Sequence, residues 1–271
     1  MTLEKICEII NLPQEVTKEV LTYVKENKSV LDEGLQKRLA VRDSWDSAVK
    51  ELEERIGEDV FGFGILAEML AIACKAYDKY TELGIDDSVF IRTMEFCTRF
   101  INDHKKVHGH YAFTWAWWFV RQLAMQEFRV GELEFEFVDA GEKYISIHIP
   151  GDADFRPENV QKTLEEYHSF LKEYFPEWSG IDLRCESWMI SPALEQLLDE
   201  NSNVLQFNRL FEVESVDYDS MAVLDWVYPG EEQNDLQNLS ENTSLQRKMK
   251  QFLMDGGKVG WAKGRIKPGS F

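Results

Sequence analysis

The sequence lacks the long apolar runs and leader features of membrane and secreted proteins. No stretch of about 18 apolar residues occurs, which argues against a membrane-spanning helix. The first residues, Met-Thr-Leu-Glu-Lys, do not have the basic start and apolar centre of a secretion signal. Cysteine is scarce, and no C-x-x-C spacing occurs. We therefore expect a cytoplasmic protein whose four cysteines are reduced and mostly buried. These are Cys7, Cys74, Cys97 and Cys185.

Basic charge is also in short supply. The net charge is −19, which argues against binding to nucleic acid or to an anionic membrane. The excess of acidic residues is unevenly distributed, because residues 1–126 carry a net charge of −5 and residues 127–271 a net charge of −14. No basic residue occurs between Arg209 and Arg247, whereas Arg247–Lys267 holds seven basic residues against one acid. Charge runs of this kind usually form a face that is exposed to solvent, and this interpretation remains possible for both runs.

Three common catalytic sequence motifs are missing. The chain contains no G-x-S-x-G, no Walker phosphate-binding sequence and no G-x-G-x-x-G. Their absence removes the usual hydrolase, nucleoside triphosphatase and dinucleotide-binding interpretations.

The first 126 residues have the periodicity of an all-helical domain. Apolar residues recur at helical spacing, and glycines stand where helices end. Ser44 and either Asp86 or Asp87 are candidate N-caps. The expected helices cover residues 13–27, 44–57, 61–83, 87–100 and 110–126.

Near Phe128 the period changes from helix to strand. Arg129–Val138 alternates polar and apolar residues, and a turn at 139–142 joins it to a second strand, Tyr144–Ile149, as in a hairpin. Pro157 favours the start of a helix that runs to Phe175, and Leu183–Ile190 is typical of a third strand. The strand, helix, strand order is a βαβ unit, so we expect an α+β fold with residues 127–271 as a second domain.

The rest of the chain is expected to add a short helix that starts at Ser191-Pro192 and runs to about Leu198, then two strands, a second helix and a tail. The strands are placed near Val204–Val216 and Met221–Tyr228. Thr243 is a candidate cap for a helix that ends at Gly256, and a short strand within a loose basic tail follows.

His148 is the most informative titratable residue, because it stands beside the loop that follows the second strand. A neutral imidazole there is able to take a proton from an incoming amine, although a structural histidine is the alternative. Cys185 and Ser187 lie on one face of the third strand and are further candidate catalytic residues. A nucleophilic cysteine needs a nearby positive charge that lowers the pKa of its thiol. Because Arg184 faces the opposite side of the strand, the competing interpretation is that Cys185 is a buried, unreactive thiol.

Two other clusters have simpler interpretations. His104, His108 and His110 resemble a metal-binding group, but no cysteine or well-spaced carboxylate completes a site, so we expect no metal. Glu134 and Glu136 resemble a pair of acid–base carboxylates, yet their alternation favours a solvated strand face.

Four short strings of the second half of the chain are distinctive as a set. They are Phe128–Glu136, Ile147–Gly151, Cys185–Trp188 and Asn203–Asn208. Together they resemble a bacterial family of two-domain acyltransferase-like proteins, in which a helical N-terminal domain precedes a domain similar to the GNAT N-acyltransferases. The resemblance covers nearly the whole chain and implies a GNAT-like mixed α/β domain with a twisted, mostly antiparallel sheet.

The resemblance also implies a reaction. Acyl-CoA or acetyl-CoA would be a co-substrate that is not tightly held, and its acyl group would pass directly to an amine. His148 would be the general base, and the backbone of Ile149 would hold the thioester oxygen. The acid-rich residues 212–241 would attract a cationic acceptor such as a polyamine or a basic peptide. The pyrophosphate would lie along Gly151, Asp152, Arg156 and Asn159.

A non-catalytic protein of the same architecture, which binds a partner or ligand, is the alternative. The GNAT pyrophosphate signature, Arg/Gln-x-x-Gly-x-Gly/Ala, is absent, and the loop instead carries Asp152 and Asp154. The tyrosine that usually serves as general acid is missing as well. Arg247, Lys248 and Lys250 would offset these acids if they folded back toward the cofactor.

Overall fold

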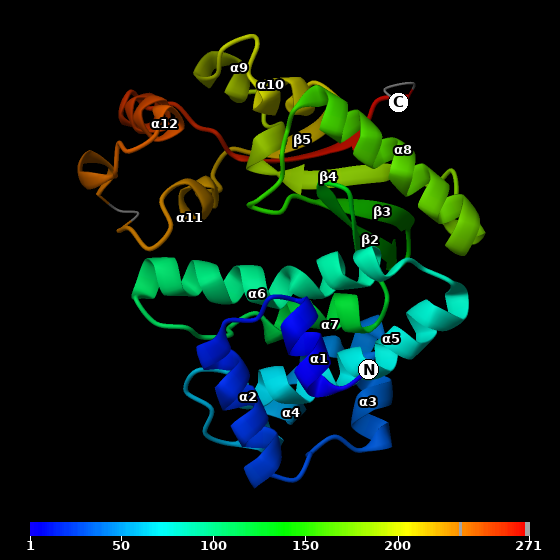
Figure 1. Cartoon of the computed structure of the whole chain (residues 1–271). Helices are drawn as coiled ribbons and strands as arrows, with labels where there is room; N and C mark the ends of the chain where they lie inside the picture. The colour runs from blue at the N-terminus through cyan, green and yellow to red at the C-terminus, as the bar shows by residue number, and fades with distance from the viewer. Residues whose placement is uncertain (233–234, 269–271) are drawn as a thin grey trace. The chain divides into compact units, whose positions relative to one another are not determined.

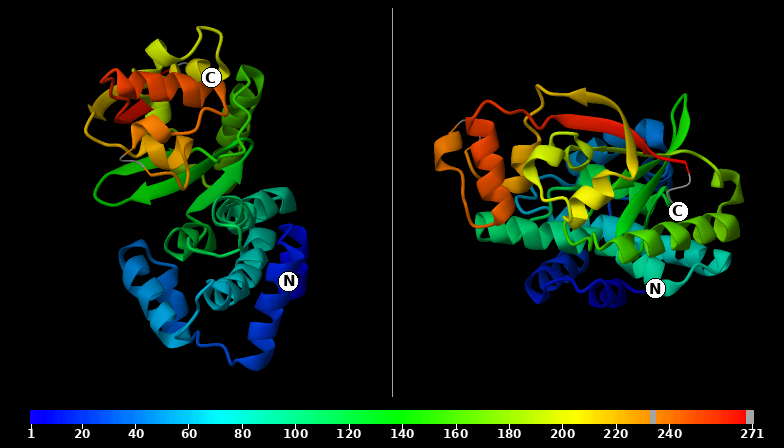
Figure 2. Two further views of the ribbon diagram at one scale, coloured as in Figure 1. Left: turned by 90° about the vertical axis from the view of Figure 1, so that its left-hand side faces the viewer. Right: turned by 90° about the horizontal axis from the view of Figure 1, so that it is seen from above.

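The computed structural model describes residues 1–232 and 235–268. The chain forms two compact units, one of Met1–Val130 and a second that begins at Gly131, and each is described by itself. Figures 1 and 2 follow the chain from its blue N-terminus to its red C-terminus. Among the described residues, no helix combines the length and the apolar character that crossing a bilayer requires.

The first unit is helical, which confirms the expected character of the N-terminal part. Its elements are α1 (Leu3–Ile9), α2 (Gln14–Glu26), α3 (Glu33–Leu39), η1 (Arg42–Ser44), α4 (Trp45–Ile56), α5 (Phe63–Leu83), α6 (Asp87–His108), α7 (Ala116–Leu123) and the short strand β1 (Glu127–Val130). The sequence reading missed α3 and ended α6 too early. Gly109, with φ +79°, ends α6. The last helix, predicted over residues 110–126, covers only Ala116–Leu123.

The two predicted N-caps of this unit have different outcomes. Asp86 caps α6, since its side chain accepts a hydrogen bond from the backbone N–H of Ser88 at 2.8 Å. Ser44 stands at the N-cap position of α4, as predicted, but the expected capping hydrogen bond is not formed. Its hydroxyl instead donates to the carbonyl oxygens of Arg38 and Val41, at 2.8 and 3.0 Å.

The second unit is a mixed α/β fold. Its elements are β2 (Leu133–Asp139), β3 (Lys143–His148), α8 (Pro157–Tyr174), η2 (Pro176–Trp178), β4 (Leu183–Ser187), η3 (Trp188–Ile190), α9 (Leu194–Leu197), α10 (Asn203–Asn208), β5 (Phe211–Asp217), α11 (Val223–Val227), η4 (Leu236–Asn238), α12 (Ser244–Met254) and β6 (Trp261–Ile266).

The strands of this unit lie in the order β2-β3-β4-β6-β5. β2 and β3 form the predicted antiparallel hairpin, with Phe135 opposite Ile147. β3 and β4 are parallel neighbours joined through α8, as the βαβ pattern predicted. β6 is antiparallel to both β4 and β5, and it runs between them in Figure 1. The sheet is thus mostly antiparallel, as expected.

Three of the predicted strands differ from the structure. Residues 188–190 form η3, because the Ser187 hydroxyl accepts from the backbone N–H of Met189 and turns the chain out of β4. Residues 203–208 and 223–227 are the helices α10 and α11, whose apolar residues join one buried cluster. By contrast, Thr243 caps α12 in the predicted way, through a capping box with Gln246.

α8 covers one face of the hairpin through aromatic contacts. Phe135 stacks on Tyr167 with ring centroids 3.6 Å apart, and Phe137 stacks on Trp178 at 4.4 Å. Ile145 and Ile147 share this buried face, since they stand opposite Phe137 and Phe135. Side chains at the alternate positions of β2 and β3 therefore face away from α8.

Candidate functional site

The parallel strands β3 and β4 are not paired as far as their carboxyl ends. Their pairing ends at Ile147 and Cys185. β4 nevertheless continues with β6 as far as Ser187, which stands opposite Ala262. Backbone pairing between the two central strands therefore stops at Ile147 and Cys185, although both chains continue beyond these residues.

Ile149 is the first residue after β3, which ends at His148. Within the ladder, the N–H of Ile145 donates to the carbonyl of Asp182 at 2.9 Å. Among residues 1–232 and 235–268, no backbone carbonyl accepts a hydrogen bond from Ile149. Pro150 follows and has no N–H. The backbone at Ile149 thus offers a donor for an oxygen placed beyond the end of this pairing.

The loop from Pro150 to Arg156 leads to the start of α8. It opens with a turn in which the N–H of Ala153 donates to Pro150 at 3.1 Å. The N–H of Asp154 then donates to a carboxylate oxygen of Glu132 at 3.0 Å, which ties the loop to the start of β2. Gly151 is exposed, with open space around its Cα. A ligand therefore has room to approach the backbone there.

Asp154 neutralises the nearest cation of this loop. Its carboxylate lies 2.7 Å from Nε and 2.6 Å from an Nη atom of Arg156, and it also accepts from the Arg156 N–H at 3.0 Å. The hydrogen bond from Arg156 lowers the pKa of Asp154, and Asn159 adds a smaller contribution. Asp154 thus holds the donors that the sequence reading assigned to a phosphate.

The first turn of α8 leaves few donors for an anion. Pro157 has no N–H, and the N–H groups of Asn159 and Val160 both donate to the carbonyl of Arg156. Asp152 is exposed at the entrance of the loop. A phosphate would therefore depend on Arg156 more than on the helix start.

His148 contacts a buried acid on the neighbouring strand. Its Nε2 lies 2.8 Å from a carboxylate oxygen of Glu136, and the two side chains are 23% and 5% exposed. Both residues stand on the sheet face opposite α8. The expectation that Glu134 and Glu136 form a solvated face is wrong, because every residue from Leu133 to Val138 is buried.

Cys185 and Ser187 both have structural surroundings. The thiol of Cys185 is fully buried, and burial raises its pKa, with a smaller contribution from Glu186. A thiol in that state is protonated and poorly nucleophilic at neutral pH. The Ser187 hydroxyl accepts from the N–H of Met189 at 3.1 Å and starts η3.

The acidic segment and the basic tail pair with each other. Arg265 of β6 lies 3.3 Å from Glu212 and 3.5 Å from Glu214, and Lys258 lies 2.7 Å from Asp219. Residues 233 and 234 of the acidic segment lie outside the described residues. These ion pairs help to hold β5 and β6 together.

The three cations that would offset the loop acids if they folded back toward a cofactor also have protein partners. Arg247 donates to the carbonyl of Glu241 at 2.7 Å. Lys248 pairs with Asp199 at 3.1 Å, and Lys250 pairs with the Glu241 carboxylate at 2.7 Å. Binding of a phosphate by these residues would have to break those contacts.

The three histidines of the first unit lie side by side at the end of α6. The ring centroids of His104 and His108 are 4.3 Å apart, and those of His104 and His110 are 4.9 Å apart. The Nδ1 atoms of His104 and His110 each lie about 3 Å from a backbone carbonyl oxygen, at 3.0 and 3.1 Å. Ring stacking and backbone contacts thus account for their arrangement.

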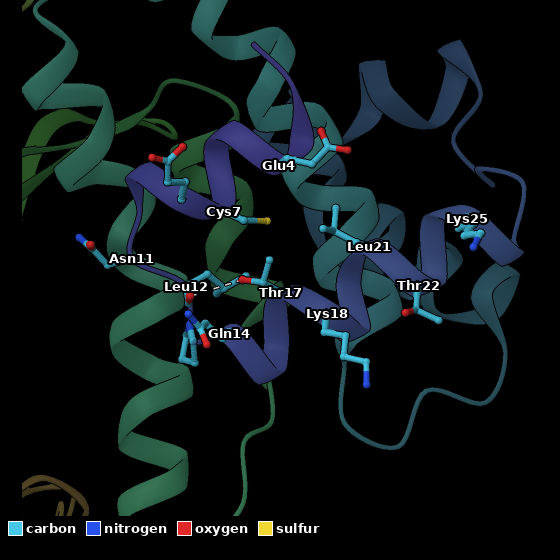
Figure 3. Close-up of a pocket in the computed structure, with 12 residues that line it drawn as sticks. Glu4, Cys7, Asn11, Leu12, Gln14, Thr17, Lys18, Leu21, Thr22 and Lys25 are labelled. Carbon is cyan, nitrogen blue, oxygen red and sulfur yellow. Dashed lines mark hydrogen bonds between the residues drawn. The ribbon is translucent and has the colours of Figure 1, made fainter.

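A shallow hollow of about 820 Å³ lies on the first unit, between α1 and α2 (Figure 3). Its charged side chains, such as Glu4 and Lys18, stand at its margin, and Thr17 donates to the carbonyl of Leu12 at 3.4 Å. Burial raises the pKa of Cys7, which also lines it, to about 11. The hollow thus has no activated group of its own.

Family models assign both parts of the chain. The model described as GNAT-like C-terminal domain matches residues 127–266, which is more than half of the chain. The chain belongs to this family. The model described as N-acyltransferase N-terminal domain matches residues 1–125. The expected two-domain acyltransferase-like family is therefore confirmed. A comparison with curated protein sequences finds no match.

Solved structures of acyltransferases have the same fold. A mutant acyltransferase in complex with octanoyl-CoA superposes with a TM-score of 0.76 at 20% identity, over 97% of this chain and 86% of that one. An acyltransferase in complex with decanoyl-CoA and teicoplanin has a TM-score of 0.71 at 19% identity, over 98% and 99%. An acyltransferase in complex with CoA and 10C-teicoplanin also has a TM-score of 0.71, at 20% identity, over 98% of this chain and 99% of that one.

Sequence reasoning does not identify two contacts of the candidate site. The alternation of β2 predicts that Glu136 faces solvent, whereas Glu136 is buried and the hairpin register places it on the same face as His148. Asp154 is expected to act as an unfavourable charge, whereas it bonds the backbone and side chain of Arg156, two residues further on. The spacing of each pair is visible in the sequence, but the burial of Glu136 and the conformation of the loop are not.

Proposed function

We propose that this GNAT-like protein is an N-acyltransferase that moves an acyl group from acyl-CoA to an amine. The observation that carries the proposal is that the β3–β4 pairing ends at Ile147 and that the backbone N–H of Ile149, just beyond it, donates to no backbone carbonyl of the described residues. A backbone N–H at such a place is suited to a thioester oxygen as that oxygen gains negative charge. The acyl-CoA complexes of structurally similar acyltransferases support the same donor.

The transfer is direct in this proposal. The amine nitrogen attacks the thioester carbon, while the N–H of Ile149 donates to the carbonyl oxygen. The C–S bond then breaks, the new C–N amide bond remains, and CoA leaves as a thiolate. His148 accepts the proton that the amine loses, and that proton ultimately neutralises the thiolate. No residue becomes acylated, so Cys185 and Ser187 have no nucleophilic role.

The CoA phosphates are assigned to the loop before α8. Gly151 and Asp152 line its entrance, and Arg156 and Asn159 stand at the helix start. Arg156 is the one basic residue of this loop, so it exchanges Asp154 for a phosphate when CoA binds.

In this proposal residues 1–126 are the helical domain and residues 127–271 are the transferase domain. The free cysteines agree with a cytoplasmic location.

The acceptor is proposed to be a cationic amine, such as a polyamine or a basic peptide. The net charge of −14 on residues 127–271 would attract such a substrate over several ångströms of solvent. Added salt should weaken the attraction between the acidic domain and the cationic acceptor. The ion pairs of Glu212, Glu214 and Asp219 reduce the contribution of those acids but do not remove the overall excess.

Two measurements on the whole chain test the proposal. Isothermal titration with acetyl-, octanoyl- and decanoyl-CoA should detect binding, and a thiol assay with spermidine or a lysine-rich peptide should detect CoA release. No binding at millimolar CoA ester would overturn the enzyme and favour the non-catalytic alternative.

A pair of histidine variants tests the general base. His148→Ala should lower the rate of transfer by about 10²-fold or more. His168→Ala, a half-buried histidine on α8, should leave it within a factor of two. Full activity of His148→Ala would remove His148 from the mechanism without affecting the donor assignment.

A further inference from the structure

The contact between Glu136 and His148 joins two adjacent strands of one hairpin. Nε2 of His148 lies 2.8 Å from a Glu136 carboxylate oxygen, and the carboxylate side chain is 5% exposed. Glu136 stands opposite Ser146, and His148 opposite Glu134, so the contact is diagonal across the β2–β3 pair. Its geometry is therefore set by the register of a single supersecondary unit.

The strand that carries Glu136 is held on both sides of that residue. Phe135 stacks on Tyr167 with an interplanar angle of 7°, and Phe137 stacks on Trp178 with an angle of 9°. Both neighbouring rings are thus buried against α8 and η2, which fixes the backbone between them. A carboxylate on such a strand holds its partner more accurately than one on a loop.

This arrangement selects one form of the imidazole. A carboxylate accepts hydrogen bonds only, so Nε2 of His148 must carry the proton of the contact. In the neutral ring the lone pair then lies on Nδ1. An imidazole held in this way has a defined basic atom and a partner for the positive charge that it gains.

We propose that Glu136 is a positioning residue that holds His148 as the Nε2–H tautomer and makes Nδ1 the atom that accepts the amine proton. The second part of this inference rests on the proposed N-acyltransferase activity. The first part does not, because the tautomer is a property of the folded protein. Glu134 is a second buried acid on the same sheet face and provides a matched control.

Nitrogen-15 NMR of the labelled full chain tests the tautomer without any substrate. At a pH at which the ring is neutral, wild-type His148 should give the long-range correlation pattern of an Nε2-protonated imidazole. Glu136→Ala should give a mixture of the two tautomers, and Glu134→Ala should keep the wild-type pattern. An Nδ1-protonated ring in the wild type, or no change in Glu136→Ala, would overturn the proposal.

Kinetics test the second part. Glu136→Ala should lower kcat by about 10- to 100-fold, a range typical of lost orienting partners, with the KM for acyl-CoA within a factor of three. Glu136→Gln is nearly isosteric, and its amide oxygen still accepts from Nε2–H, so it should recover part of kcat. A loss confined to KM would contradict the proposal, and so would equal losses in the Gln and Ala variants.

The two proposals fail in different ways. If the chain transfers no acyl group, the NMR result still decides whether Glu136 sets the tautomer. If circular dichroism shows that Glu136→Ala does not fold, the wild-type spectrum alone decides the tautomer, because an Nδ1-protonated ring there overturns the proposal. A normal kcat and an unchanged ring pattern in Glu136→Gln and Glu136→Ala together would reject the positioning role while leaving the transferase intact.

Discussion

Asp154 engages Arg156 through both its side chain and its backbone. One carboxylate oxygen contacts the guanidinium at 2.6 and 2.7 Å, and the other accepts from the Arg156 N–H at 3.0 Å. A phosphate would use the same donors. The carboxylate is therefore an internal competitor for any anion that binds at the start of α8.

Asp154→Asn should tighten the binding of acyl-CoA. The substitution removes a negative charge and frees the Arg156 guanidinium, so the dissociation constant should fall by about three- to ten-fold at low salt. Isothermal titration of the wild type and the variant with acyl-CoA measures the dissociation constants. Asp152→Asn removes the same charge from the same loop and should have a smaller effect. Equal effects would mean that overall charge, and not the pairing with Arg156, controls affinity.

The ion pair between Glu142 and Arg184 should make stability depend on pH. Hydrogen bonding to Arg184 lowers the pKa of Glu142 below its ordinary value of 4.5. The stabilisation is therefore fully present above about pH 4.5 and is lost as the pH falls through the lowered pKa. The free energies of unfolding of wild type and Glu142→Gln should differ at pH 7 and converge near pH 3. Glu173→Gln, an exposed charge on α8, should not reproduce this pattern.

Cys185 should be dispensable for acyl transfer. Its thiol is buried and its pKa is raised, so the reactive thiolate is not populated at neutral pH. Cys185→Ala should keep kcat within a factor of three and lose about 1 kcal/mol of stability from the smaller side chain. Mass spectrometry after brief iodoacetamide treatment should find Cys185 unmodified in the folded protein. Rapid alkylation, or loss of kcat in a folded variant, would restore the thiol as a catalytic candidate.

Gly131→Ala should destabilise the second unit strongly. Gly131 has φ +58°, and an added Cβ would lie 2.3 Å from Oγ1 and 3.0 Å from Cα of Thr163 on α8. Strain and overlap together should cost about 3 kcal/mol or more, measured by denaturant unfolding. Gly141 has φ +83°, but an added Cβ there would meet no other atom. Gly141→Ala therefore measures the backbone strain alone, which should cost about 1 kcal/mol of unfolding free energy. Similar losses in both variants would show that close packing on Thr163 contributes nothing.

The sequence was sufficient for the hairpin, α8 and the parallel strands that it joins, because apolar alternation and Pro157 are strong local signals. A short strand in the basic tail is also predicted, and it is β6. Its bounds and partners do not follow from the sequence, because its buried positions are Ala262 and Gly264, which give little hydrophobic contrast. Residues 204–208 form a helix because α10 packs into a distant cluster, and tertiary burial overrides a local strand preference.

The candidate site was partly predictable. The loop after β3 and the position of His148 follow from the βαβ pattern. The burial of Glu136 does not, because an alternating strand is expected to face water on one side. The pairing of Asp154 with Arg156 depends on a loop conformation that composition does not specify.

The placement of β6 between β4 and β5 affects how the domain is made. β6 follows α12 in the chain, so β4 and β5 emerge from the ribosome long before the strand that separates them. Until residue 266 is available, both present unpaired edges to solvent, a state prone to wrong pairing between chains. Completion of the sheet is thus a late event in biosynthesis. Truncations within 261–266 should give insoluble protein even though they leave every candidate site residue in place.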